Sequence, residues 1–211
     1  MQAWKPFSIL GRGLVGRALA GAWGDKVALL PHEARPGGLV LLAVPDRHVE
    51  ALARDFPARC VHLSGSLHLD GVPCAHPLTS FDGAPALWQG TPLAITGAVP
   101  VALVAAFEAI GFVPFVLPAA LKPLYHACAV LASGHAASLW LGARDLLASR
   151  GIDLPGRGLA PLAEATLSNI ERHGPAGRTG PFVRGDEATI ARDAAALDGA
   201  WREVFLKLGA L

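Results

Sequence analysis

Gly11-Arg12-Gly13-Leu14-Val15-Gly16 is the most informative stretch of this sequence, because it directly follows the apolar run Phe7–Leu10 and opens the helical segment Leu14–Trp23. In a strand–loop–helix unit of this kind the first glycine allows a tight turn, the second lets backbone N–H groups approach a pyrophosphate, and the third lets the helix pack closely on the strand. The positive end of the helix then faces the phosphates. The stretch therefore predicts a dinucleotide site formed by all six residues, with a glycine-rich turn that binds no ligand as the alternative.

The composition predicts a folded globular protein. The chain has 211 residues, and 52% hydrophobic with 17% charged residues is not the composition of a disordered chain. Its net charge is +1 and Lys and Arg do not cluster, so we expect no nucleic-acid partner. The most apolar stretch, Ala119–Ala148, is interrupted by charged residues such as Lys122 and Arg144. A membrane span needs about 20 nearly uninterrupted apolar residues, so we expect a buried helix and no membrane segment.

Cysteine and histidine usage bears on the compartment and on metal binding. The chain has three cysteines, an odd number, and no Cys-x-x-Cys arrangement, which is typical of reduced thiols. The start, Met1–Pro6, lacks the basic and then apolar pattern of a signal peptide, so we expect a cytoplasmic protein. The spacing of His62, His68 and His76 is not that of zinc ligands, so we expect no metal site.

The first half of the chain alternates strand-like and helical runs. The apolar runs that predict strands are Phe7–Leu10, Val27–Leu30, Leu39–Val44, Cys60–Leu63, Val72–Ala75, Leu93–Thr96 and Val113–Val116. The runs that predict helices are Leu14–Trp23, Arg47–Phe56 and Val99–Ile110. Continuous apolar strands alternating with helices indicate an α/β fold, with a mostly parallel, doubly wound sheet covered on both faces.

Beyond Pro118 the strand-like runs stop. The expected helices are Ala119–Ser149, Gly158–His173 and Asp186–Leu208. We therefore expect a dinucleotide-binding domain over residues 1–118 and an all-α domain over 119–211. A helix of about 30 residues would be ~45 Å long, which is more than a small domain covers, so the helical domain is expected to form a homodimer and contribute to substrate binding.

The link His32–Gly38 is too short for the helix that normally joins the second and third strands. A helical parallel crossover needs at least about 10–12 residues. An extended link of this length spans about 23 Å, just enough to return along a strand and step over two strand spacings. We therefore expect this helix and the outermost strand to be missing, which removes one wall of the usual adenosine pocket.

The start of the same link is expected to lie at the cofactor ribose. Glu33 could accept a hydrogen bond from a ribose 2′-hydroxyl, which favours NAD, whereas Arg35, His32 and Arg12 could hold a 2′-phosphate, which favours NADP. A solvated loop without a ligand is the alternative.

Two further loops follow the predicted third and fourth strands. Loops at the carboxyl ends of parallel strands line the ligand crevice, so Ala43-Val44-Pro45 and Ser64-Gly65-Ser66 are expected to border the nicotinamide. Asp46 is expected to cap the next helix through its side chain. The alternative for the serines is ordinary turn chemistry.

The candidates for acid–base chemistry are His76, Lys122 and His126. Lys122 and His126 are four residues apart and share one face of a helix. On a mostly apolar helix this pair favours a polar cleft, in which Lys122 would polarise the reacting oxygen and His126, or alternatively His76, would move the proton. The alternatives are a Lys122 that reaches solvent and histidines buried for structural reasons, and Pro123 places Lys122 at the start of the helix.

The connection Thr179–Asp186 lies before the last expected helix. Asp186 is expected to be its N-cap. Thr179 and Arg184 are expected either to reach an active-site cleft or, for Arg184, to pair with Asp186.

A family resemblance rests on motifs from both halves of the chain. In the first half these are Ile9–Gly16, Leu41–Asp46, His62–Ser66 and His76-Pro77-Leu78. They resemble Rossmann-like bacterial oxidoreductases related to ketopantoate reductase and pyrroline-carboxylate reductase. In the second half, Leu121–Ala129 and Thr179–Asp186 resemble the helical C-terminal domain of unknown function that accompanies such domains in one family. The resemblance implies an NADP-type fold and a dimer formed mainly through the helical domain.

The wider superfamily of β-hydroxyacid dehydrogenases implies roles for single residues. It has a Lys and an Asn four residues apart at the reacting carbonyl or hydroxyl; Lys122 matches the lysine, and His126 stands at the asparagine position. The pair His76-Pro77 is similar to the His-Pro of prephenate dehydrogenases. Gly134 stands where an asparagine is expected in this family.

The sequence therefore predicts an NAD(P)-dependent oxidoreductase, with NADP favoured and NAD possible, acting on a small polar substrate such as a hydroxy, keto or imino acid. The alternative is a nucleotide-binding or scaffold protein that keeps the fold without turnover, which Gly134 and the missing adenosine wall favour.

Overall fold

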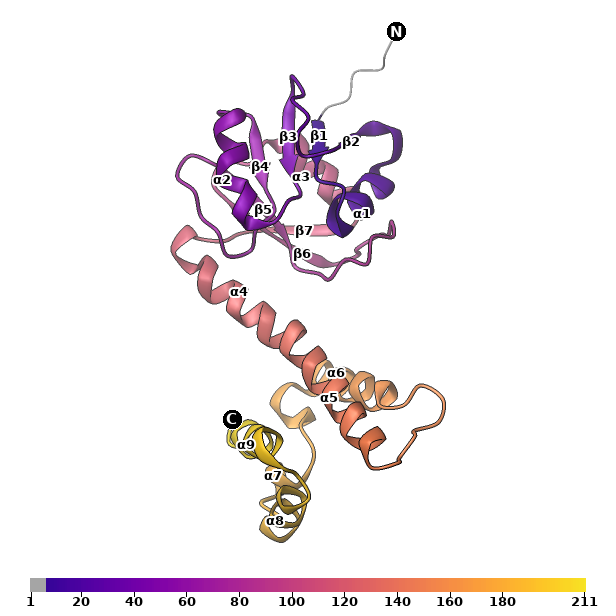
Figure 1. The fold of residues 1–211 in the computed structure, drawn as a ribbon. Helices are drawn as coiled ribbons and strands as arrows, with labels where there is room; N and C mark the ends of the chain where they lie inside the picture. The colour runs from indigo at the N-terminus through magenta and orange to yellow at the C-terminus, as the bar shows by residue number, and fades with distance from the viewer. Residues whose placement is uncertain (1–6) are drawn as a thin grey trace. The chain divides into compact units, whose positions relative to one another are not determined.

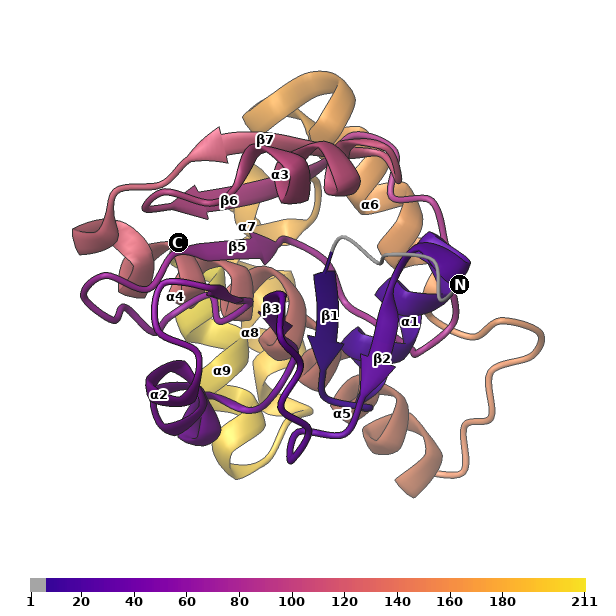
Figure 2. The same ribbon diagram turned by 90° about the horizontal axis from the view of Figure 1, so that it is seen from above.

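The computed structural model describes residues 7–211, which divide into one compact unit that ends at Ala137 and a second that runs from Ser138 to Leu211. Within the described residues, the first unit contains a seven-stranded sheet in the order β2-β1-β3-β4-β5-β6-β7 (Figures 1 and 2). The strands are β1 Phe7–Leu10, β2 Ala28–Leu30, β3 Leu39–Leu42, β4 Cys60–His62, β5 Cys74–Pro77, β6 Thr91–Thr96 and β7 Phe112–Val116. Strands β1 to β5 are parallel, and β6 and β7 run the opposite way. The expected mostly parallel α/β sheet is confirmed.

Helices cover both faces of the sheet because successive strand residues point to opposite faces. The helices α1 (Leu14–Trp23) and α3 (Val101–Glu108) pack against one face, where Trp23 also donates a hydrogen bond of 2.8 Å from Nε1 to the carbonyl of Ala106. The helix α2 (Asp46–Asp55) packs against the other face through side chains such as Val49. The chain thus changes face between β1 and β3, and the carboxyl ends of these strands form the topological switch point.

The link between β2 and β3 contains no helix, as expected from its length. Strand β2 has three residues and lies at the edge of the sheet, so the sheet that residues 7–211 form lacks the outermost strand of the usual fold. The guanidinium of Arg59 holds the returning link by donating hydrogen bonds to the carbonyls of Pro36 (3.0 Å) and Gly38 (3.2 Å). These two bonds keep the link close to the start of β4.

The helical part begins directly after the sheet. The expected helix Ala119–Ser149 is a single-turn helix η2 (Ala119–Leu121), helix α4 (Lys122–Val130), a π-helical turn (Leu131–His135) and helix α5 (Ala136–Ser149). Helix α4 belongs to the first unit by its contacts. The remaining elements of this part are α6 (Ala160–His173), the 3₁₀ turn Gly174–Gly177, α7 (Pro181–Arg184), α8 (Glu187–Ala195) and α9 (Gly199–Gly209).

The expected single helix Asp186–Leu208 was wrong, because α8 and α9 are separate helices. Asp198 has an extended backbone, with φ of −104° and ψ of 151°, and Gly199 has a φ of +50°. A left-handed residue cannot continue a right-handed helix, so the chain turns here.

The described residues were also compared with the requirements for a membrane-spanning helix, a metal site and a disulfide. Within residues 7–211, no helix combines the length and the apolar character that crossing a bilayer requires. Across the same residues, no group of three His, Cys, Asp or Glu side chains is arranged to hold a metal ion. All three cysteines are free thiols, with Cys60 and Cys74 buried and Cys128 exposed.

Candidate functional site

The glycine loop after β1 meets the loop after β3 at the switch point. The amide of Gly11 donates to the carbonyl of Leu30 (3.0 Å), and the amide of Ala43 donates to the carbonyl of Leu10 (2.8 Å). Gly11 has a φ of +114°, and a Cβ at this position would collide with the carbonyl of Ala43. A Cβ on Gly16 would likewise collide with the carbonyl of Gly11. These two glycines are therefore needed for the tight turn and for close packing of α1 on β1.

Gly13 has a different role, because the space beside it is open. It is the N-cap of α1 and has an extended backbone. Among residues 7–211, no side chain caps this helix, and apart from Gly13 and its chain neighbours no atom lies within 4 Å of where a Cβ on Gly13 would be. The first N–H groups of an α-helix have no partner inside the helix and carry the positive end of its dipole. The open space at Gly13 thus suits a diphosphate that accepts hydrogen bonds from these groups.

The loop after β4 is fixed through the side chain of Ser64. Its hydroxyl donates to Oδ2 of Asp46 (2.8 Å) and accepts from the amide of Leu67 (2.9 Å), and its own amide donates to Nδ1 of His62 (3.2 Å). The expectation that Asp46 caps α2 was wrong: Pro45 is the N-cap, and no side chain caps this helix. The carboxylate of Asp46 instead joins the loop after β3 to the loop after β4.

Lys122 lies at the start of α4, directly before Pro123, and its side chain is fully buried. Its ammonium donates to the carbonyl of Ser64 (2.9 Å) and to Sγ of Cys74 (3.0 Å), and the thiol of Cys74 donates to the same carbonyl (3.1 Å). Of the three ammonium donors, two are therefore used by protein groups.

Two imidazoles and a phenol lie next to Gly65. Nδ1 of His76, at the carboxyl end of β5, is 3.0 Å from the hydroxyl of Tyr125 on α4. A Cβ on Gly65 would lie 2.7 Å from Nε2 of His76 and 2.6 Å from Nδ1 of His126, so only a glycine lets both rings approach this point. The rings are nearly perpendicular, with centroids 6.0 Å apart. Nδ1 of His126 is buried and has no hydrogen-bond partner among residues 7–211.

The surroundings of His62, His76, Cys74 and Tyr125 keep these four groups uncharged near neutral pH. Burial, and then the charge of Lys122, lower the pKa of both His62 and His76 to about 4. Burial raises the pKa of Tyr125 to about 12 and also raises the pKa of the Cys74 thiol. The neutral imidazole of His76 can accept a proton from a bound group, and the protonated phenol of Tyr125 beside it can donate one.

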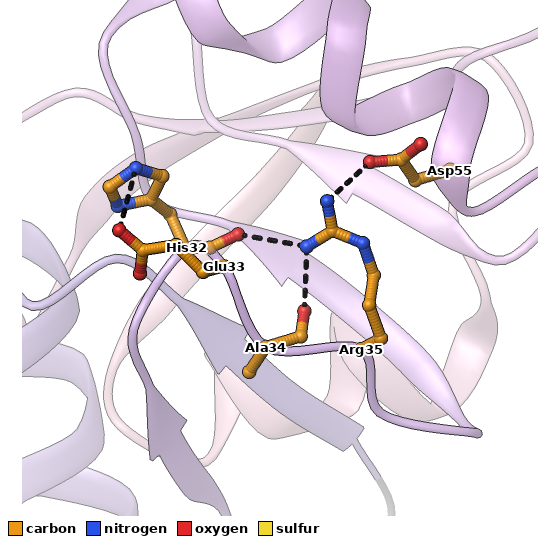
Figure 3. A network of polar contacts seen from close by, with 5 residues as sticks. All are labelled: His32, Glu33, Ala34, Arg35 and Asp55. Atoms are coloured by element: carbon orange, nitrogen blue, oxygen red, sulfur yellow. Dashed lines mark hydrogen bonds and ion pairs between the residues drawn. The ribbon is translucent and has the colours of Figure 1, made fainter.

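The residues expected at the cofactor ribose form their own network after β2, which Figure 3 shows. Nη2 of Arg35 pairs with Oδ2 of Asp55 (2.7 Å), and Nη1 donates to the carbonyls of His32 (3.3 Å) and Ala34 (3.1 Å). Nε2 of His32 lies 3.2 Å from Oε1 of Glu33. The ring of His32 also stacks on that of His48, with centroids 5.8 Å apart. Arg35 and His32 thus already contact carboxylates, and their contact with a 2′-phosphate stays a prediction.

The structure brings many of the predicted site residues together at the carboxyl ends of the parallel strands. Gly11 adjoins Ala43 and Val44, and the loop Ser64-Gly65-Ser66 adjoins His76, His126 and Lys122. The side chain of Arg12 is exposed. Thr179 and Arg184 belong to the second unit, so they are not assigned to this site.

Sequence reasoning gave no role at the site to Cys74 or Tyr125. A signal was present for both, because Cys74 stands two residues before His76 on the same strand face, and Tyr125 directly precedes His126. The resulting contacts join residues 48 or 49 positions apart, which only the packing of α4 on β5 reveals.

A comparison with protein families gives one match to the sequence. A family model described as a domain of unknown function, DUF2520, matches residues 91–211, more than half of the chain. The search of curated proteins found no match to this chain.

The fold is similar to those of several solved proteins. Protein TM1727 from Thermotoga maritima aligns with a TM-score of 0.77 and 20% identity, over 97% of this chain and 95% of that one. A Bacteroides fragilis protein provisionally described as an NADP oxidoreductase aligns with a TM-score of 0.77 and 18% identity, over 98% of this chain and 96% of that one. A reductive aminase from Aspergillus terreus, solved with NADPH and ethyl levulinate, aligns with a TM-score of 0.67 and 17% identity, over 98% of this chain and 91% of that one. At these identities the likeness establishes a shared Rossmann-like fold and nothing finer.

Proposed function

Because the chain belongs to the DUF2520 family, whose function is unknown, its activity has to be inferred from its own residues, and we propose that it is a cytoplasmic NAD(P)-dependent oxidoreductase. It would move a hydride between the nicotinamide and a small polar substrate that carries a C=O or C=N group. The observation that carries the proposal is the open space at Gly13, above the uncapped start of α1 at the switch point. The free thiols fit a reducing compartment.

The residues around the switch point fit a dinucleotide. Residues 11–16 would hold the pyrophosphate, because Gly11 and Gly16 make the turn and Gly13 leaves room for it. The loops Ala43-Val44-Pro45 and Ser64-Gly65-Ser66 would border the nicotinamide, which when bound supplies or accepts the hydride. We favour NADP over NAD because Arg12 and Arg35 stand near the expected ribose, and a reductive aminase of this fold was solved with NADPH. A Myxococcus stipitatus imine reductase variant of the same fold was solved with NAD⁺.

The protein's own part in the reaction is to place the substrate and move a proton. His126 is the first candidate for the proton transfer, because its Nδ1 is buried without a partner next to Gly65. His76 is the second, with Tyr125 hydrogen-bonded to its Nδ1. The sequence predicts that Lys122 contacts the reacting oxygen. Since its ammonium is fully buried against Ser64 and Cys74, we now assign Lys122 no contact with the substrate.

A second candidate function is nucleotide binding without turnover. The feature that favours it is the shortened link after β2, which leaves a three-residue edge strand and no helix beside the adenosine position. A protein of this kind would bind the cofactor but consume none with any imine, ketone or alcohol.

We also propose that two copies associate through the helical region. Large apolar side chains on its helices are exposed, which is common at interfaces. They include Trp140 and Leu141 on α5, and Leu162, Leu167 and Ile170 on α6.

The test is an equilibrium titration with NADPH and with NADH, followed by nicotinamide fluorescence. The key variant is Gly13→Asp, because an aspartate is a good N-cap and leaves α1 folded while its carboxylate repels a pyrophosphate. The matched control is Gly37→Asp, at another open glycine that has no left-handed backbone. We expect saturable binding by the wild type and the control, and at least about tenfold weaker binding by Gly13→Asp, equivalent to ~1.4 kcal/mol.

Two results would contradict the proposed site: no saturable binding of either cofactor, or equal binding by Gly13→Asp and wild type. Binding that is confirmed would then be followed by cofactor oxidation with a panel of cyclic imines and 2-keto acids. Turnover supports the oxidoreductase, and binding without turnover supports the second candidate.

A further inference from the structure

The ammonium of Lys122 is a buried charge with an unusual set of partners. The side chain has no exposed surface, and among residues 7–211 no carboxylate pairs with it. Its partners are a carbonyl and a thiol, those of Ser64 and Cys74. Burying a charge is costly unless polar groups compensate it, so these two hydrogen bonds are needed to stabilise the buried ammonium.

The three groups form a closed triangle of hydrogen bonds. The carbonyl of Ser64 accepts from Nζ of Lys122 and from Sγ of Cys74, and the same sulfur accepts from Nζ. The triangle joins the start of α4, strand β5 and the loop after β4. Gly65 follows Ser64 directly, so the position of this carbonyl fixes where Gly65 lies between the two imidazoles.

We propose that Lys122 is a positioning residue, whose ammonium fixes the Ser64 carbonyl against Cys74 and so holds Gly65 between His76 and His126. This inference rests on the proposed function, in which these histidines carry the proton. It gives Lys122 a place behind the reacting groups, with no contact to the substrate.

The charge of Lys122 adds a second effect at His76. After burial, this charge is the largest cause that lowers the pKa of His76 to about 4, followed by the charge of His126. Asp46 acts in the opposite direction, and its carboxylate accepts from the hydroxyl of Ser64. Two further titratable neighbours are Tyr125, which hydrogen-bonds to Nδ1 of His76, and His62, whose own pKa the charge of His76 lowers. Removing the charge of Lys122 therefore raises the pKa of His76.

The test uses Lys122→Met in the cofactor-free protein, because methionine keeps the length and fits a buried site without the charge or donors. The imidazole signals are followed by NMR as the pH is changed. We expect the titration midpoint of His76 to rise by about one pH unit in this variant. Lys26→Met, at an exposed lysine, is the matched control and is expected to leave the midpoint unchanged. A folded Lys122→Met protein with the wild-type midpoint overturns the proposal.

A second measurement decides the case if Lys122→Met does not fold. The wild type is treated with a small amine-reactive reagent, and labelling at each lysine is followed by mass spectrometry. Lys122 is expected to react at least about tenfold more slowly than the exposed Lys26 and Lys207, because a buried, hydrogen-bonded amine is protected. Equal labelling would mean that the ammonium is accessible, which overturns the proposal.

The variant Cys74→Ala separates the tether from the charge. It removes one corner of the triangle and keeps the ammonium, so Lys122 is expected to label severalfold faster than in the wild type. An unchanged rate would overturn the tether. None of these measurements uses a cofactor or a substrate, so their failure is distinguishable from a failure to bind or turn over NADPH.

Discussion

Gly65 has no side chain, and this lets the imidazoles of His76 and His126 lie against the same point of the backbone. The sequence places a glycine in the loop after β4 and a histidine in each of β5 and α4, so these site residues could be found from motif and position. The partner of Lys122 could not. Helical spacing puts Lys122 on the face of His126, but its contact with Cys74 depends on how α4 packs against β5.

The lowered pKa values of His62 and His76 predict that acid weakens the fold. In the unfolded chain an imidazole binds its proton near pH 6.5, whereas the folded protein resists protonation down to about pH 4. The unfolded state therefore takes up more protons between these limits, and stability present above pH 6.5 is lost as the pH falls toward 4. The loss is on the order of 3 kcal/mol for each histidine.

The measurement is urea unfolding at a series of pH values from 7.5 to about 4. The variant His62→Gln is expected to show a smaller decrease, because one of the two titrating groups is gone. A free energy of unfolding that stays constant over this range, or rises toward acid, would contradict the pKa values of the site.

At the scale of elements, apolar runs predicted where the strands lie, and length predicted that the link after β2 has no helix. Both expectations rest on local physics: buried parallel strands need apolar side chains on both faces, and seven residues cannot hold a helical crossover. The break between α8 and α9 was missed because the amphipathic pattern continues through it. The left-handed backbone of Gly199, which ends the helical path, is seen only in the structure. The π-helical turn Leu131–His135 also leaves no mark in the sequence pattern.

The N-cap of α8 is an element that sequence and structure agree on. Oδ1 of Asp186 accepts a hydrogen bond of 3.1 Å from the amide of Thr189, and this bond holds the pKa of Asp186 below its usual value. Asp186→Ala is therefore expected to lower the thermal unfolding midpoint by about 2 to 4 °C. Asp198→Ala is the matched control, because Asp198 precedes α9 without a side-chain cap and its ion pair with Arg150 is exposed to solvent, where such pairs add little stability. Equal effects in calorimetry would contradict the cap.

For the whole molecule, we expect a homodimer. Sedimentation equilibrium is expected to give twice the chain mass of 21.8 kDa. Leu167→Lys puts a charge among the exposed apolar side chains of α6 and is expected to shift the protein to a monomer, whereas Glu171→Lys, at an exposed polar position of the same helix, is the control. A monomeric wild type at micromolar concentration would contradict this prediction.

The glycine loop and the histidine cluster are proposed to serve one bound cofactor, and imidazole NMR with NADPH tests this proposal. NADPH is expected to shift the signals of His76 and His126, because its nicotinamide would lie beside Gly65. The fragment 2′-phospho-ADP-ribose, which lacks the nicotinamide, is expected to bind at the glycine loop and leave those signals nearly unchanged. Saturable NADPH binding without any shift of His76 or His126 would contradict the claim, because the cofactor would then end elsewhere.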